Sequence, residues 1–189
     1  MFFIFLVGLS RFNRFELYPS STELRLINET FNIEIDNVND LDVLITKIKM
    51  TMKEDDRFDG QISFDAPEKF RYGSCYNRSL LIQKILLYNE IDFYPVYVFY
   101  ELSGTTSVFS VFRRSISSHQ SLVVYFGENY YFVEVNNSNS GITVRNLYDS
   151  WDDYKQNSVL REYDIRFIPY LNNRHGRYIW PNFLPDFYL

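Results

Sequence analysis

Cysteine is the scarcest reactive residue in this chain, with a single copy, Cys75, among 189 residues. One cysteine excludes an intramolecular disulfide framework and a cysteine-rich zinc site. It is compatible with a reducing compartment, so we expect a cytoplasmic protein. Histidine is nearly as scarce, with only His119 and His175, and their spacing from Cys75 is not that of metal ligands. We therefore expect neither a metal centre nor another cofactor.

Positive charge is also in deficit, because 19 lysines and arginines face 24 aspartates and glutamates, for a net charge of −5. A general nucleic-acid binder normally presents a basic face, so we expect no nucleic-acid partner. Long apolar runs are missing as well: residues 2–7 are apolar, but a membrane span needs about 20 such residues. That run lacks a basic leading region and a clear cleavage pattern, so we expect no signal peptide. We interpret it as a buried first strand or short helix, the alternative being the end of an upstream membrane segment.

No repeat, low-complexity tract or linker rich in proline and glycine interrupts the chain. Its length suits one domain with a sizeable core, and its hydrophobic (46%) and charged (23%) fractions are those of globular proteins. We therefore expect a single domain over residues 1–189. Aromatic residues are in excess, with 16 Tyr, 18 Phe and 2 Trp, and they predict a core and a cleft lined with rings. We assign these rings no function by themselves.

The hydrophobic pattern of the first half predicts a hairpin followed by two helices. Residues 24–35 alternate between apolar and polar side chains, as the two strands of a hairpin do. Apolar side chains at helical spacing predict a helix over residues 39–52. A loop over residues 57–72 then leads to a second, strongly apolar helix over residues 75–89.

The second half of the chain predicts antiparallel strands. Residues 94–100 are rich in β-branched and aromatic side chains, which favours a strand. A long loop over residues 101–118 precedes a hairpin of residues 121–126 and 130–135, joined by a turn that contains glycine. A short polar helix is predicted near residues 151–156, and the rest of the tail stays unassigned. This order predicts an α+β fold with helices packed on one face of an antiparallel sheet.

Cys75 stands at the front of the second predicted helix, directly after a turn made by Gly73 and Ser74. In the first turn of a helix, unpaired backbone N–H groups and the positive end of the helix dipole favour a thiolate. Reactive cysteines occupy such electropositive settings. The alternative is a structural cysteine, because free cysteine is among the most buried residue types.

A nucleophilic thiol needs a base to take its proton, and the base needs a third group to fix its tautomer. His119 opens a predicted strand, where it can face a helix N-terminus packed across the sheet, so we prefer it to His175 in a polar, turn-like stretch. On the following strand, Glu134 and Asn136 share one face, and antiparallel pairing brings both back towards His119. Either could accept a hydrogen bond from the imidazole. The alternative for each is a polar side chain that faces solvent, and we prefer this alternative for Glu134.

The order of these residues resembles the transglutaminase-like fold, the circularly permuted relative of papain-type cysteine proteases. In both, a cysteine starts a helix, a histidine starts a strand, and an acid or amide ends the next strand. The matching stretches are residues 41–52, 73–75, 80–87, 91–98, 119, 122–124 and 131–136. The resemblance therefore covers about residues 40–137, and it implies a Cys-bearing helix packed on an antiparallel sheet.

The resemblance further implies acyl-group chemistry through a thioester, carried by a Cys75–His119–Asn136 triad. We expect hydrolysis of a peptide or amide bond in a protein or peptide substrate, with transamidation or another acyl transfer as alternatives. Two features depart from the family pattern: asparagine stands where aspartate is usual, and Gln120 and Ser121 follow the histidine where an aromatic is common. These departures keep a second hypothesis open, a catalytically inactive binding or assembly module.

Overall fold

The structure is a computed structural model, and it describes residues 18–55, 63–101, 116–136, 144–159 and 164–167. The apolar run at residues 2–7, His175 and most of the expected loop over residues 101–118 lie outside the described residues. None of the helices in the described ranges is both long enough and apolar enough to cross a membrane. The single domain over residues 1–189 stays a prediction, because these ranges leave gaps.

Within the described ranges, four α-helices and one 3-10 helix accompany a five-stranded antiparallel sheet. The strands lie in the order β4-β3-β2-β1-β5. In chain order the elements are α2 (Ser21–Phe31), α3 (Val38–Thr51), η2 (Pro67–Phe70), α4 (Cys75–Tyr88), β1 (Phe93–Glu101), β2 (Ile116–Phe126), β3 (Asn129–Val133), β4 (Leu147–Tyr148), α5 (Trp151–Asn157) and β5 (Asp164–Phe167). The α+β class expected from the sequence is therefore confirmed.

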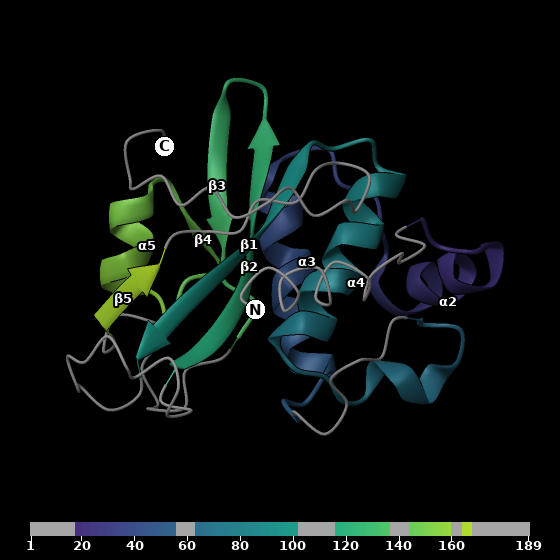
Figure 1. The fold of residues 1–189 in the computed structure, drawn as a ribbon. Helices are drawn as coiled ribbons and strands as arrows, with labels where there is room; N and C mark the ends of the chain where they lie inside the picture. Colours follow the sequence, from purple (N-terminus) through teal and green to yellow (C-terminus); the bar gives the residue numbers. More distant parts are fainter. Residues whose placement is uncertain (1–17, 56–62, 102–115, 137–143, 160–163, 168–189) are drawn as a thin grey trace, which may run out of the picture.

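The two faces of the sheet pack against different helices. Leu122 of β2 and Val133 of β3 belong to a core cluster built with α3 and α4, whereas their neighbours Val123 and Phe132 pack with Tyr154 of α5. This division follows from the period of two along a strand. Figure 1 shows α3 and α4 together on one side of the sheet and α5 on the other. The expectation that helices cover one face is correct for α3 and α4 and wrong for α5.

The first described helix, α2, replaces part of the hairpin expected over residues 24–35. Ser20 and Glu23 form a capping box: the Ser20 hydroxyl accepts from the Glu23 N–H at 3.2 Å, and the Glu23 carboxylate accepts from the Ser20 N–H at 2.9 Å. Ile27 and Phe31 follow Glu23 at four-residue spacing and are buried. The hairpin prediction was wrong because the apolar residues of this segment fit both an alternating and a helical spacing. The capping box before them favours the helix. Asn32, with φ 57°, ends the helix.

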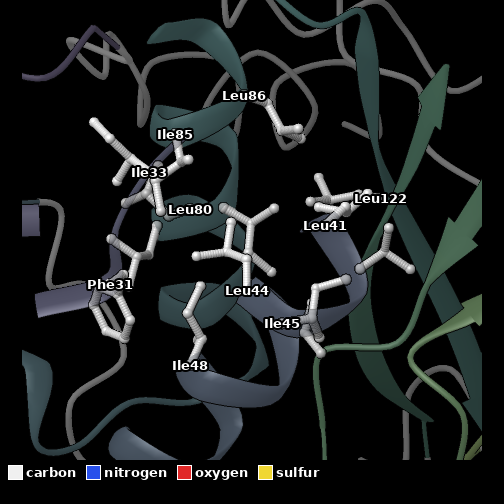
Figure 2. Close-up of a cluster of buried hydrophobic side chains, with 14 of the residues drawn as sticks. Phe31, Ile33, Leu41, Leu44, Ile45, Ile48, Leu80, Ile85, Leu86 and Leu122 are labelled. Carbon is white, nitrogen blue, oxygen red and sulfur yellow. The ribbon is translucent and has the colours of Figure 1, made fainter. Parts of the chain in front are cut away.

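Helices α3 and α4 form the main core with the sheet, as the sequence predicted for each of them. The expected apolar face of α3 is buried, and Figure 2 shows Leu41, Leu44, Ile45 and Ile48 of this helix directed towards the rest of the cluster. Helix α4 is buried on nearly all sides over residues 77–86, because it lies between α3 and the strands. A helix enclosed in this way must also bury its polar residues, and each of those then needs partners.

The hairpin of β2 and β3 is confirmed, with Leu122 opposite Val133 and a turn in which Gly127 has φ +62°. Glycine is favoured there because a side chain is strained in this left-handed conformation. Strand β2 begins at Ile116, earlier than expected, because it pairs with β1 from Ile116 to Val124. The predicted helix near residues 151–156 is α5, which Ser150 caps by accepting from the Asp153 N–H at 3.1 Å.

Candidate thiol site

Cys75 is the first residue of α4, as predicted, and its side chain is half-buried. Ser74 caps the helix: its hydroxyl accepts from the Tyr76 N–H at 3.2 Å, and Asn77 Oδ1 accepts from the Ser74 N–H at 2.9 Å. These side chains leave the thiol in the first turn, where backbone N–H groups and the helix dipole favour negative charge. The local sequence therefore determines where the sulfur stands.

His119 lies in β2, and its imidazole contacts Glu134 and lies near Cys75. Its Nε2 is 2.9 Å from Glu134 Oε1, and Cys75 is close enough to help raise the pKa of the ring. Because Glu134 occupies Nε2, we infer that Nδ1 is the ring nitrogen left for the thiol. His119 is 3% exposed and Glu134 is fully buried. Buried polar groups need hydrogen-bond partners, and each of these two side chains supplies one for the other.

Glu134 follows the last residue of β3, and hydrogen-bond donors surround its carboxylate. Oε1 accepts from the Asn136 N–H at 2.9 Å in addition to His119. Oε2 accepts from the Tyr154 hydroxyl at 3.5 Å and from the Val159 N–H at 3.4 Å. Burial raises the pKa of Glu134, but the charge and hydrogen bond of His119 oppose this, so that the net pKa is lowered. The carboxylate is therefore ionised at neutral pH.

The same interactions act on His119 in the opposite sense. Burial lowers the pKa of His119, but the charge of Glu134 and hydrogen bonds to Cys75 and Glu134 outweigh it, raising the pKa to about 10. At neutral pH the ring is then an imidazolium paired with a carboxylate. A protonated ring beside a thiol is the form that pairs with a thiolate and that donates a proton to a leaving group.

Asn136, which the sequence assigned to orient His119, has other partners. Its Oδ1 accepts from Arg78 Nη1 at 3.1 Å, its Nδ2 donates to Glu54 Oε1 at 3.1 Å, and its N–H donates to Glu134. Among the hydrogen bonds of the described residues, none joins Asn136 to His119. The expected solvent-facing position of Glu134 is also wrong, because this side chain is buried against His119.

The contacts of Asn136, and not the register of the β2–β3 hairpin, explain the exchange of these two roles. Leu122 is opposite Val133, so continuing the register would place Asn136 opposite His119 and Glu134 as a diagonal neighbour on the same face, within reach of a long side chain. The ladder ends at Val133, and beyond it the Asn136 side chain bonds to Arg78 and Glu54. Period-two reasoning identified the face correctly, but it did not predict these partners.

Two further side chains of the site were not predicted, Arg78 and Tyr154. Arg78 is 1% exposed and contacts the segment that follows Glu134. The Tyr154 hydroxyl donates to Glu134 Oε2 at 3.5 Å, and burial raises its pKa well above the usual value. A signal for Arg78 exists, since a polar run at residues 77–79 interrupts an apolar helix. Tyr154 has none, being one of 16 tyrosines.

Lys49 of α3 adds a positive charge near Glu134. Its Nζ donates to Asn146 Oδ1 at 2.8 Å. Burial lowers the pKa of Lys49 to about 8, against the opposing charge of Glu134. Across the described ranges, no group of three or more His, Cys, Asp and Glu side chains is arranged to hold a metal ion. The site within these ranges thus consists of a thiol, an imidazole, a carboxylate and the charged groups around them.

No protein-family model matches this chain, and no curated protein matches it. A functional argument therefore rests on the chemistry of the site. A thiol at a helix N-terminus, close to a histidine that contacts a buried carboxylate, supplies the three residue types that nucleophilic catalysis by cysteine requires.

Proposed function

We propose that this protein is a thiol-dependent enzyme of the transglutaminase-like type, in which Cys75, His119 and Glu134 perform acyl-group chemistry on a protein or peptide substrate. The single observation that carries the proposal is the His119–Glu134 pair at 2.9 Å, placed close enough to Cys75 at the start of α4 for the thiol to contribute to the raised pKa of His119. Glu134 takes the part that the sequence had given to Asn136. A Cys-bearing helix packed on an antiparallel sheet supports the family resemblance, which remains part of this proposal.

In the proposed reaction, Cys75 Sγ forms a bond to the carbonyl carbon of the substrate. His119 gives its proton to the departing amine nitrogen as the carbon–nitrogen bond breaks, which leaves a thioester. Water then attacks the thioester, His119 takes the proton of that water, and the thiolate departs. The Cys75 N–H, at the start of α4, is the proposed oxyanion donor, and losing one such donor typically costs about 10²–10³ in rate. An amine in place of water would give transamidation.

The first test is the rate at which iodoacetamide alkylates Cys75 at pH 6. Ordinary thiols titrate near pH 8.5, so the urea-unfolded chain serves as an internal reference. We expect the native chain to react at least about tenfold faster than the unfolded chain, because a thiolate paired with an imidazolium persists where a free thiol is protonated. The measurement is unambiguous because the chain has one cysteine.

Matched variants test the roles within the site. His119→Ala and Glu134→Gln should each remove most of the native rate advantage, since one deletes the imidazole and the other removes the charge that holds it protonated. Asn136→Ala should keep a larger part of it, because the Asn136 N–H to Glu134 survives. If Asn136→Ala instead abolishes the advantage while Glu134→Gln retains it, the assignment of Glu134 is wrong.

A second candidate function is a catalytically inactive binding or assembly module. The burial of the site favours it, because His119 and Glu134 are nearly inaccessible and only Cys75 is half-buried. In such a module, native Cys75 would react no faster than the unfolded chain.

If the thiol is activated, incubation with an activated acyl ester followed by mass measurement should show one acyl group on Cys75. Release of that group by water or by an added amine then separates hydrolysis from transamidation.

A further inference from the structure

Arg78 carries a charge that the fold has buried at high cost. It lies one helical turn after Cys75 in α4, and its side chain is 1% exposed. Removing a guanidinium from water is unfavourable unless its hydrogen bonds are replaced. Arg78 Nη2 donates to Met52 O at 2.6 Å, and Nη1 donates to Val135 O at 3.3 Å and to Asn136 Oδ1 at 3.1 Å.

These contacts join three segments around the thiol site, two of which carry Cys75 and Glu134. Met52 directly follows α3, Arg78 belongs to the helix that begins with Cys75, and Val135 follows Glu134 directly. The bonds made by Asn136 extend the connection, because its N–H donates to the same Glu134 oxygen that contacts His119. The guanidinium is thus linked to the carboxylate through one residue.

We propose that Arg78 is a positioning residue of the thiol site: its guanidinium holds the segment after Glu134 at a fixed place relative to the helical turn that carries Cys75. This inference rests on the proposed function. The planar fork of arginine is suited to the task, because it presents several N–H groups in fixed directions to acceptors on two segments. A lysine would keep the charge but would direct one ammonium group from a flexible stem.

The charge of Arg78 also faces other groups of the site. Glu54 Oε2 lies 3.6 Å from Nη1, and Glu134 and the Cys75 sulfur attract the guanidinium, whereas Lys49 repels it. Burial nevertheless lowers the pKa of Arg78. In the part of the chain that the structure describes, its Nε–H has no acceptor. A test must therefore separate the geometry of the fork from its charge.

The experiment measures Cys75 alkylation by iodoacetamide between pH 5 and 9 in the full chain and in Arg78→Lys and Arg78→Gln. We expect both variants to lower the native rate at pH 6 about tenfold, the size expected for a lost hydrogen bond to a charged group. We also expect both to move the acid side of the profile towards that of the unfolded chain. Near-UV circular dichroism establishes that each variant is folded.

Lys84→Gln is the matched control. Lys84 is a second buried cation of α4, 2% exposed, but its ion pair at 2.9 Å is with Glu23 of α2 and not with the site. Its removal should lower stability while leaving the alkylation rate of the folded chain within about twofold, as for distant independent positions. Should Arg78→Gln fail to fold, Arg78→Lys carries the test, because it removes part of the fork's contacts without emptying the buried position.

The outcomes separate this inference from the proposed function. If native wild-type Cys75 reacts as an ordinary thiol, the proposed function fails. If the wild type is activated and Arg78→Lys keeps its rate and profile, the positioning role of the fork is overturned, whatever Arg78→Gln does. An equal loss in Lys84→Gln would also overturn it, since the effect would then follow from burial of charge in α4 alone.

Discussion

Gly73, two residues before Cys75, lies where the chain entering α4 pairs with the end of α3. Its N–H donates to Lys53 O at 3.0 Å. A Cβ at this position would come within 2.6 Å of Met52 Cε and 2.8 Å of Asn77 Cβ. The methionine end can move aside, but Asn77 Cβ is attached to the backbone of α4. Glycine is required here because the two segments approach so closely, and that approach positions the thiol.

Gly73→Ala should therefore destabilise the fold and disturb the site together. We expect the free energy of unfolding in urea to fall by about 1–3 kcal/mol, the usual effect of overpacking, and Cys75 alkylation at pH 6 to slow. Gly127→Ala is the control: its φ of +62° is strained for alanine, yet nothing lies within 4 Å of the added Cβ. This control should lose stability by about 1–2 kcal/mol and keep its thiol reactivity. Wild-type stability and reactivity in Gly73→Ala would contradict the argument.

At the residue scale, the sequence predicted that Cys75 and His119 lie near each other, but not which side chain contacts the imidazole. The two residues could be singled out because cysteine and histidine occur only once and twice in the chain. Choosing between Glu134 and Asn136 required the contacts of Asn136 with Arg78 and Glu54, which residue types do not specify. The polar run at residues 77–79 was a signal for Arg78, but its partners include the backbone carbonyls of Met52 and Val135, which leave no trace in the sequence.

Between elements, a buried ion pair joins α2 to α4. Lys84 Nζ lies 2.9 Å from Glu23 Oε1, the same oxygen that accepts from the Phe64 N–H at 2.9 Å. Both side chains are buried. Burial raises the pKa of Glu23, but bonds to the Phe64 and Ser20 N–H groups and to Lys84 lower it overall. The Glu23 carboxylate thus accepts a hydrogen bond from the N-cap residue of α2, accepts another from the Phe64 N–H, and pairs with Lys84 of α4.

Removing one partner of this pair should cost more than removing both. Lys84→Met leaves a buried carboxylate without its counter-charge, and we expect a loss of about 3–5 kcal/mol in the free energy of unfolding. Glu23→Leu combined with Lys84→Met should lose less than the sum of the single changes, because no isolated charge remains. Urea unfolding of the three variants measures this coupling. Strictly additive losses would show that the two side chains do not stabilise each other.

At the scale of elements, periodic apolar patterns made α3 and the β2–β3 hairpin predictable, and a long apolar run after the turn at Gly73 and Ser74 did the same for α4. The segment at residues 24–35 was not, because its apolar side chains fit both an alternating and a helical spacing. The capping box of Ser20 and Glu23 was the signal that distinguishes them. The extra length of β2 follows from its pairing with β1, a contact between distant segments that local patterns do not contain. The same holds for β4 and β5.

For the whole molecule, the buried pair of His119 and Glu134 creates a pH dependence of stability. The pKa of His119 rises from 6.5 to about 10 on folding, so its contribution is complete below pH 6.5 and is lost as the pH rises through about 10. The pKa of Glu134 is lowered from 4.5, so its contribution is present above that value and is lost as the pH falls through the lowered pKa. Lys49 acts in the opposite sense between about pH 8 and 10.5, because the unfolded chain then holds the proton longer.

Between pH 6.5 and 8 the effect of His119 is therefore free of the effect of Lys49. We expect the free energy of unfolding to fall across this window with a slope approaching about 1.4 kcal/mol per pH unit, the value for one proton. Cys75→Ala is the appropriate background, because it removes the ionisation of the thiol. Urea unfolding at several pH values gives the slope, and His119→Ala in the same background should abolish it. A flat profile before that second change would show that the ring is not held protonated.

The buried pair of His119 and Glu134 also sets an upper bound on the stability of the fold. Replacing a buried ion pair by well-packed apolar side chains of similar volume is often neutral, or stabilises a protein by about 1–4 kcal/mol. A chain selected for thermal endurance alone has no reason to keep an imidazolium and a carboxylate buried. The most durable version of this protein would therefore replace both, and under the proposed function it would also lose the reactivity of its thiol.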